Sequence, residues 1–237
     1  MKNAQTLHEL VAANRILAKY GVLDGFGHVS VRDDENPDRF WISRSLAPEL
    51  VTADDLLLLG LDGEPIDAQG RKSYAERFIH AEAYRARQDV ISVIHSHAPS
   101  IIPFAATGVS LRPIYHMSSF LGFGVPIFEI SDTGGDGTDM LVSSPMLGEA
   151  LARTLGPSAV SLMRGHGMVV VGSSIREAVF RGIYTMQNAH LQAEALKLGT
   201  ARFLSAAESK AATAFNAVSL ERPWALWMRE IGMPLAP

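Results

Sequence analysis

Two closely spaced histidines carry the clearest chemical signal in this sequence. His95 and His97 follow an apolar, β-branched run at residues 90–94. Because side chains on a strand alternate between faces, residues i and i+2 point the same way, with Cα atoms about 6.6–7 Å apart. Two imidazoles at that spacing can converge on one metal ion. The alternative is that both rings only form hydrogen bonds to their neighbours at a strand end.

A metal site needs at least a third ligand. His166 is the best candidate, because it stands between Gly165 and Gly167. Flanking glycines let the backbone approach closely and turn sharply. The same segment can also be no more than a bend between two strands, but its combination with the His95–His97 pair favours a metal site.

A carboxylate stands four residues before another histidine. Glu76 and His80 lie in a predicted helix over residues 75–87, and the spacing puts both on one face. Glu76 can then be a metal ligand or a general base. A surface contact between the two side chains is the alternative, and the spacing alone does not decide between them.

The elements that must position these side chains are mixed helices and strands. The first predicted helix begins with a Thr6–Glu9 capping box and stops at Gly21, and a glycine-rich turn at Gly25 then enters a strand. Further helices are predicted at residues 75–87, 99–107, 144–155 and 175–198, and further strands at residues 40–43, 56–61, 90–94, 124–130, 159–163 and 168–171. This spacing suits one α/β or α+β domain.

Composition excludes several classes of function. The chain has 237 residues, and its 21 basic and 25 acidic side chains give a net charge of −4, which argues against binding to nucleic acid or an anionic membrane. A hydrophobic content of 47% indicates a folded core. The absence of cysteine excludes disulfides, thiolate ligands and a cysteine nucleophile. No signal peptide or membrane span is evident, so we expect a cytoplasmic protein.

Several motifs together point to a known family. The sequence resembles the class II aldolase and adducin family over residues 7–200, on the motifs Glu76-x-x-x-His80, His95-Ser96-His97 and Gly165-His166-Gly167. The resemblance implies a three-layer α/β/α domain with a central, mainly antiparallel sheet flanked by helices. It also implies a homotetramer with active sites at subunit interfaces. We expect residues 1–205 to form this domain, and residues 206–237 to form a C-terminal extension that packs on it or on a neighbouring subunit.

The resemblance also implies roles for single residues. His95, His97 and His166 correspond to the ligands of one divalent metal ion per subunit, with zinc or manganese favoured over cobalt or magnesium. Glu76 corresponds to an acidic residue that ligates the metal or acts as base. His116 stands where aldolases of the family have a tyrosine proton donor from the neighbouring subunit, and His28 replaces an asparagine that contacts substrate. We therefore expect Glu76, His116 and His28 to be catalytic.

The phosphate-binding segments of the sugar-phosphate aldolases are changed in this sequence. Hydroxyl and glycine positions that would hold a phosphate are replaced at Arg44-Ser45, at Tyr74 before Glu76, and in the loop Phe26-Gly27-His28. Arg44 suits a carboxylate, so we expect a small-molecule carboxylate substrate contacted by Arg44, Ser45, Tyr74 and Phe26. An ordinary surface charge at Arg44, and core packing of the aromatic side chains, including Phe120, are the alternatives.

These departures resemble a branch of the family that contains decarboxylases of hydroxylated aromatic acids. They imply a metal-dependent, non-oxidative decarboxylase of a hydroxylated benzene or pyridine carboxylic acid in aromatic catabolism. The first alternative is a metal-dependent aldolase acting on an unphosphorylated hydroxy acid or hydroxy ketone. The second is a non-catalytic scaffold like the adducin head domains, against which the three intact histidines argue.

Overall fold

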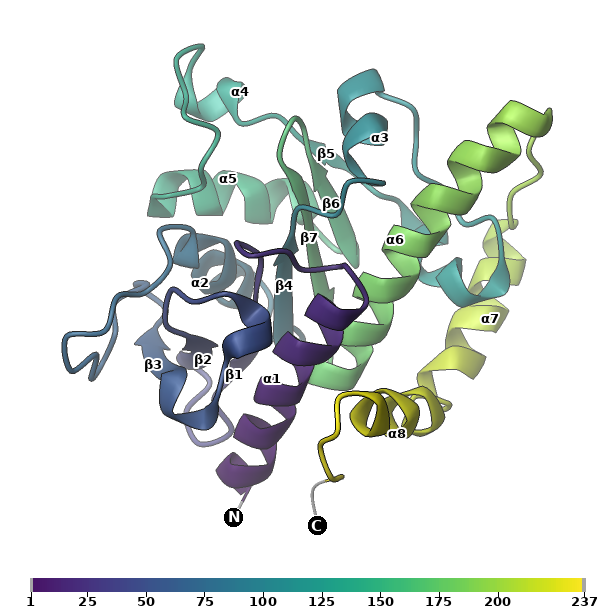
Figure 1. Ribbon diagram of the computed structural model, residues 1–237. Coiled ribbons are helices and arrows are strands. Elements are labelled where there is room, and N and C mark those ends of the chain that lie inside the picture. The colour runs from purple at the N-terminus through teal and green to yellow at the C-terminus, as the bar shows by residue number, and fades with distance from the viewer. Residues whose placement is uncertain (1, 236–237) are drawn as a thin grey trace.

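A seven-stranded sheet runs through the computed structural model, which describes residues 2–235 (Figure 1). Its spatial order is β3-β2-β1-β4-β7-β6-β5, and every neighbouring pair is antiparallel except the parallel pair β5–β6. The strands are β1 His28–Arg32, β2 Arg39–Ser43, β3 Leu56–Gly60, β4 Ser92–Ser96, β5 Ile127–Phe128, β6 Val160–Met163 and β7 Gly167–Gly172. The expectation of a central, mainly antiparallel sheet is confirmed.

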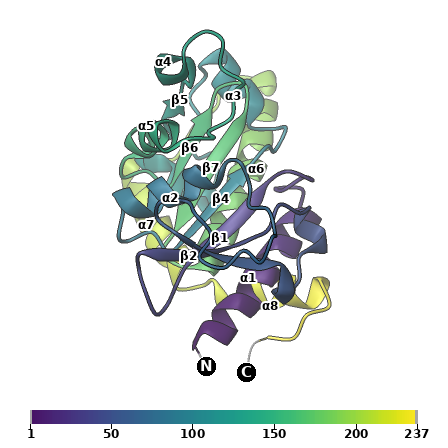
Figure 2. The same ribbon diagram turned by 90° about the vertical axis from the view of Figure 1, so that its left-hand side faces the viewer.

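Helices cover both faces of this sheet. Helices α2 (Arg77–Ala86) and α5 (Pro145–Leu155) lie on one side, and α1 (Lys2–Lys19) and α6 (Ile175–Leu198) lie on the other (Figures 1 and 2). Successive side chains of a strand point to opposite faces of the sheet and so pack against both helix layers. Val93 and Val169 belong to one core cluster, and Ile94 and Val170 belong to the other. This is the expected three-layer α/β/α arrangement.

The C-terminal residues form two further helices, α7 (Ala206–Ala217) and α8 (Glu221–Glu230). Helix α7 packs against a 3-10 segment, η3 (His116–Phe123), and α8 contacts α1, with Trp224 and Trp227 buried in the core. The remaining elements are α3 (Ile102–Thr107), α4 (Ser131–Gly134) and two short 3-10 turns at Pro48–Leu50 and Ala53–Asp55. Among the described residues, no helix has the length and apolarity needed to cross a membrane.

Some predicted boundaries were wrong. Helix α1 begins at Lys2, so Thr6 lies inside it, and its hydroxyl donates to Asp34 rather than capping the helix. The predicted strand at residues 90–94 lies two residues later as β4. The predicted strand at 124–130 shrinks to two residues, because Gly124 has a φ of 110° and β5 is an edge strand paired on one side only. The stop after α1 is confirmed, since Gly21 adopts a left-handed φ of 71°.

Candidate metal centre

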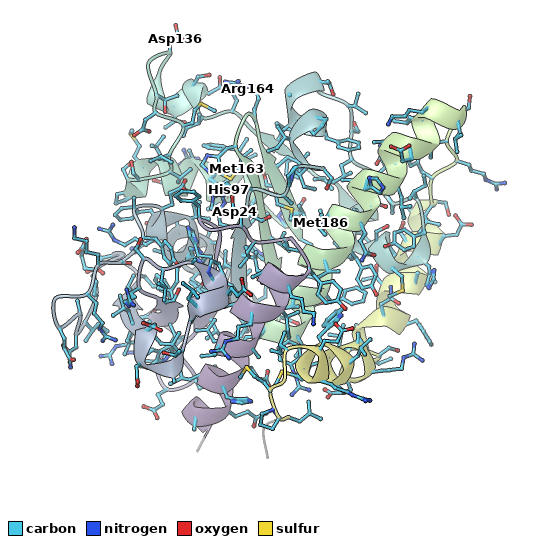
Figure 3. The ribbon with its side chains drawn as sticks, in the orientation of Figure 1. Asp24, His97, Asp136, Met163, Arg164 and Met186 are labelled. Atoms are coloured by element: carbon cyan, nitrogen blue, oxygen red, sulfur yellow. The ribbon has the colours of Figure 1, made fainter. Side chains whose placement is uncertain are left out.

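The side chains of Glu76, His95, His97 and His166 converge on one point. Each offers one ligand atom, and these four atoms all lie within 4.8 Å of one another. His95 lies on β4, His97 follows that strand, His166 lies in the turn between β6 and β7, and Glu76 precedes the first residue of α2. In Figure 3, His97 and Asp24 are labelled together near the middle of the molecule, with Met163 close by. The fold thus brings together the four residues that the sequence motifs indicated for a metal site.

The spacing of the three imidazoles fits a shared metal ion. The Nε2 atom of His95 is 3.0 Å from the Nε2 atoms of both His97 and His166, which are themselves 3.2 Å apart. Nitrogens bound at about 2.0–2.1 Å to one ion lie roughly 2.8–3.4 Å apart when the ligand angles fall between those of an octahedron and a tetrahedron. The observed separations fall inside this range.

The opposite nitrogen of each ring faces a hydrogen-bond acceptor. His95 Nδ1 lies 3.2 Å from the carbonyl oxygen of Met168, and His166 Nδ1 lies 2.6 Å from that of Met140. His97 Nδ1 lies 3.3 Å from the carboxylate of Asp24. Because these oxygens only accept, each ring carries its proton on Nδ1 and presents a bare Nε2 to the centre.

This protonation pattern is the test of whether a metal fits. Three nitrogen lone pairs at hydrogen-bond distance repel one another, and a single proton can join only two of them. One divalent cation accepts all three, and imidazole is a common ligand for zinc and for other first-row metals. The donor set of this cluster therefore fits a divalent metal ion.

Glu76 supplies the negative charge of the centre. Its carboxylate oxygens lie 3.4 Å from His95 Nε2 and 3.5 Å from His166 Nε2, and one of them accepts the backbone N–H of Val142 at 3.0 Å. Burial raises the pKa of Glu76, but positive charge at His166 and His95, either a proton on a ring or a cation bound between the rings, outweighs burial and holds the pKa well below its ordinary value. Glu76 is therefore ionised, as a ligand or a base must be.

Close backbone approach explains the glycines around His166. A Cβ atom on Gly167 would lie 2.0 Å from the carbonyl oxygen of Ser96, so only glycine lets β7 reach β4 at this point. Gly165 adopts a left-handed φ of 67° that turns the chain from β6 to β7. Met140, whose carbonyl faces His166, has an uncommon φ of 70° for a residue other than glycine.

His28 lies directly beside the cluster. It pairs with His95 across β1 and β4, and the two ring centroids are 5.1 Å apart. Its other neighbours are Tyr74, with ring centroids 4.4 Å apart, and His80, whose Nε2 lies 2.6 Å from His28 Nδ1. Burial lowers the pKa of His28 well below its ordinary value. The surface-pair interpretation of Glu76 and His80 was wrong, because His80 is completely buried.

The predicted substrate-binding residues lie in different surroundings. The Nε atom of Arg44 is 2.7 Å from the carboxylate of Asp55, and Arg44 keeps a partly exposed side chain. The Tyr74 hydroxyl donates to the carbonyl of Leu46 at 2.6 Å, so Tyr74 is held rigidly next to His28. Ser45 is exposed, and Phe26 is 77% exposed.

His116 is not part of this cluster within one chain. It is exposed at the start of η3, which packs against α7 and α6, and its carbonyl accepts a hydrogen bond from Asn216. A residue contributed to a neighbouring subunit is expected to lie away from its own chain's site. Phe120, in the same segment, is a core residue packed against Phe180, which excludes it as an exposed aromatic wall within this chain.

Sequence reasoning missed the residues that orient the ligands. Asp24 had no signal except its place before the Gly25-Phe26-Gly27 turn, whose backbone N–H groups at Phe26 and Gly27 it accepts. Met140 acts through a carbonyl, so its side-chain type carried no information. Ser30 belongs to the loop motif that begins at Phe26, but nothing in the sequence indicated its contact with His80, and Tyr84 had no signal.

Comparison with known proteins finds one matching family and several relatives that are named decarboxylases. The family described as Class II Aldolase and Adducin N-terminal domain matches residues 8–193. The chain is 38% identical to "Decarboxylase tropJ" of Talaromyces stipitatus, over 93% of this chain and 92% of that protein. It is 32% identical to a 3,4-dihydroxyphthalate decarboxylase of Terrabacter sp., over 86% of this chain and 87% of that protein.

Solved structures give the same fold. L-fuculose 1-phosphate aldolase from Glaciozyma antarctica superposes with a TM-score of 0.78, over 98% of this chain and 93% of that chain. Its sequence identity is 24%, so this likeness concerns the fold.

Proposed function

Because this chain belongs to the class II aldolase and adducin N-terminal domain family, we propose that it is a metal-dependent, non-oxidative decarboxylase of a hydroxylated aromatic carboxylic acid. The observation that carries the proposal is the set of three inward-facing Nε2 atoms beside an ionised Glu76. Relatives at 38% and 32% identity that are named decarboxylases support the reaction type.

The chain is an enzyme of the carbon–carbon lyase class. Its relatives are named decarboxylases, and its structural neighbours are named aldolases, and both reactions break a carbon–carbon bond. The complete ligand cluster disfavours a scaffold role. Within this class we propose decarboxylation rather than retro-aldol cleavage.

We assign the metal to His95, His97 and His166, with Glu76 as a fourth, exchangeable group. A bound divalent ion, zinc or manganese in the first place, supplies Lewis-acid stabilisation of negative charge on the substrate. The protein fixes the ligands through Met168, Met140 and Asp24, so little reorganisation accompanies substrate binding.

The remaining residues bind the acid and manage protons. The rings of Tyr74 and His28 lie side by side next to the cluster, tilted by 38° to each other, and the guanidinium of Arg44 suits a substrate carboxylate. Loss of carbon dioxide leaves an electron pair on the ring carbon, which must take up a proton. Glu76 is ionised and His28 is neutral, so we assign the proton donor to His116 of a neighbouring subunit in a homotetramer.

The test is product analysis after incubation with a panel of hydroxylated aromatic carboxylates. Protein loaded with manganese or zinc is expected to release carbon dioxide, and the chelator-treated protein and a His97→Ala variant are expected to release none. Release of an aldehyde from an unphosphorylated hydroxy acid or hydroxy ketone, with no carbon dioxide from any aromatic acid, would establish the aldolase instead. Full activity of the His97→Ala variant would refute both.

A further inference from the structure

A buried row of hydrogen-bonding side chains leads away from His28 into the protein. His28 Nδ1 lies 2.6 Å from His80 Nε2, and His80 Nδ1 lies 2.6 Å from the Ser30 hydroxyl. The Ser30 hydroxyl lies 2.7 Å from the Tyr84 hydroxyl, which reaches the carbonyl of Ile91 at 3.4 Å. All four side chains are at most 1% exposed. We call these four residues the His28 chain.

Strand and helix periodicity produce this row together. His28 and Ser30 are two apart on β1, so both point to the α2 side of the sheet. His80 and Tyr84 are four apart on α2 and face the same strand, one turn and two turns beyond Glu76. The His28 chain therefore continues the helix face that begins at the candidate metal centre.

Counting protons gives the row a direction. Each contact in the row holds one hydrogen. The Ile91 carbonyl accepts the backbone N–H of Arg32 at 2.8 Å, and its second lone pair accepts a hydrogen bond from the Tyr84 hydroxyl. Ser30 then donates to Tyr84, His80 Nδ1 donates to Ser30, and His28 Nδ1 donates to His80 Nε2. His28 is left with a bare Nε2, which has no hydrogen-bond partner among the described residues.

Burial keeps this arrangement neutral. Burial lowers the pKa of His80 to about 3, so its ring is neutral. A neutral imidazole accepts one hydrogen bond and donates one. Without the Ser30 hydroxyl, Nδ1 of the buried His80 would have no hydrogen-bond partner. A buried polar group without a partner lowers the free energy of unfolding. The hydroxyls of Ser30 and Tyr84 thus decide which nitrogen of His28 bears the proton.

We propose that His80, Ser30 and Tyr84 are positioning residues that hold His28 with its proton on Nδ1, so that Nε2 accepts a hydrogen bond from a hydroxyl group of the substrate. The substrate part of this inference rests on the proposed function, whereas the tautomer does not. A bare nitrogen attracts a ring hydroxyl, which can donate a hydrogen bond, and repels the oxygens of a carboxylate, which carry no proton at neutral pH. It therefore selects acids that carry a hydroxyl group.

The tautomer is measurable without turnover. In zinc-loaded protein with 15N-labelled histidine, the two ring nitrogens of His28 differ strongly in chemical shift according to which one bears the proton, and a His28→Gln variant assigns the signals. We expect the proton on Nδ1 in the wild type. In Tyr84→Phe, Ser30 loses its acceptor and turns its hydroxyl to His80, so the proton of His28 is expected to move to Nε2.

Ser30→Ala is the second variant, in case Tyr84→Phe does not fold, and it is expected to give a mixture of the two tautomers. Ser92→Ala is the matched control, because the Ser92 hydroxyl is equally buried and donates to the Ser30 carbonyl at 2.8 Å but lies outside the row. The assignment is overturned if the wild-type His28 carries its proton on Nε2. It is also overturned if neither Tyr84→Phe nor Ser30→Ala changes the tautomer of His28.

Ligand binding tests the substrate part separately. Zinc-loaded wild type is expected to bind 3-hydroxybenzoate, whose single hydroxyl cannot form a chelate with the metal, about two- to tenfold more tightly than benzoate, as one hydrogen bond allows, and Tyr84→Phe is expected to lose this preference. Equal affinity for both acids in the wild type, with the proton on Nδ1 of His28, overturns the hydroxyl contact while leaving the tautomer standing. Failure of all decarboxylation assays would affect neither measurement.

Discussion

At the scale of single residues, the candidate metal centre depends on what lies behind its ligands. Each of the three histidines has one nitrogen facing an acceptor, and only one of these acceptors, Asp24, is a side chain. Asp24 is therefore the orienting contact that mutation can test directly. The carbonyls of Met140 and Met168 are fixed by the backbone instead.

We predict that Asp24→Asn weakens metal binding without abolishing it. An amide oxygen still accepts from His97 Nδ1, but it lacks the charge that makes the imidazole a stronger ligand, so the dissociation constant is expected to rise about tenfold. Metal titration followed by calorimetry gives the value. Asp34→Asn, which alters an exposed carboxylate that accepts from Thr6, is the control. Equal affinity in Asp24→Asn and wild type would show that this contact does not tune the ligand.

The turn that carries His166 offers a pH-dependent prediction. A hydrogen bond from Arg164 lowers the pKa of Glu129 from 4.5 to about 2 and ties this turn to the end of β5. Because the folded pKa is the lower one, the pair stabilises the fold above about pH 5, and this stabilisation is lost as the pH falls toward about 2. The difference in Tm between wild type and Glu129→Gln should shrink over that range. A difference that stays constant from pH 7 to pH 2 contradicts the assignment.

At the scale of elements, the site lies where β4 and β7 approach most closely. Gly167→Ala would place a Cβ atom 2.0 Å from the Ser96 carbonyl oxygen, so the two strands must move apart. We expect a loss of about 2 kcal/mol or more in the free energy of unfolding, together with weaker metal binding, measured by urea denaturation and metal titration. Gly137→Ala, where a Cβ meets nothing within 4 Å, is the control. Unchanged metal affinity in Gly167→Ala would show that the position of His166 does not depend on this contact between β4 and β7.

Periodicity within elements is what made the ligands predictable. The His95–His97 spacing, the glycines around His166 and the Glu76–His80 spacing are local patterns, and helices 144–155 and 175–198 were bounded by clear caps. The contact of His28 with His80 depends on the pairing of β1 with β4, which no local pattern encodes. The short β5 was overestimated because an apolar run does not reveal an edge strand.

At the scale of the whole molecule, the C-terminal residues were the least predictable. Trp224 and Trp227 are buried in the same core cluster as α1 and α6 rather than covering the cluster of Glu76 and the histidines. The sequence predicted an extension that packs on the domain or on a neighbouring subunit, but not which face of the protein it covers. We still propose the boundary near residue 205, between the family domain and an extension that completes its core.

The homotetramer that we propose makes a prediction about mixed subunits. His97→Ala keeps His116 but lacks a metal ligand, whereas His116→Ala keeps the ligands but lacks the proton donor. Each variant alone is expected to be inactive, and random mixing of equal amounts should restore about one quarter of the sites, since a complete site takes one contribution from each of two neighbours. A mixture that stays inactive, although mass analysis shows mixed tetramers, would exclude His116 as the donor across the interface.

The most direct test of the central claim is a metal titration of activity. Metal-stripped protein is mixed with increasing manganese or zinc, and carbon dioxide release from a hydroxylated aromatic acid is measured at each point. Activity is expected to be absent at the start, to rise linearly, and to level off at one ion per chain. Carbon dioxide release by the stripped protein, or no release from any such acid with one ion bound per chain, would contradict the account.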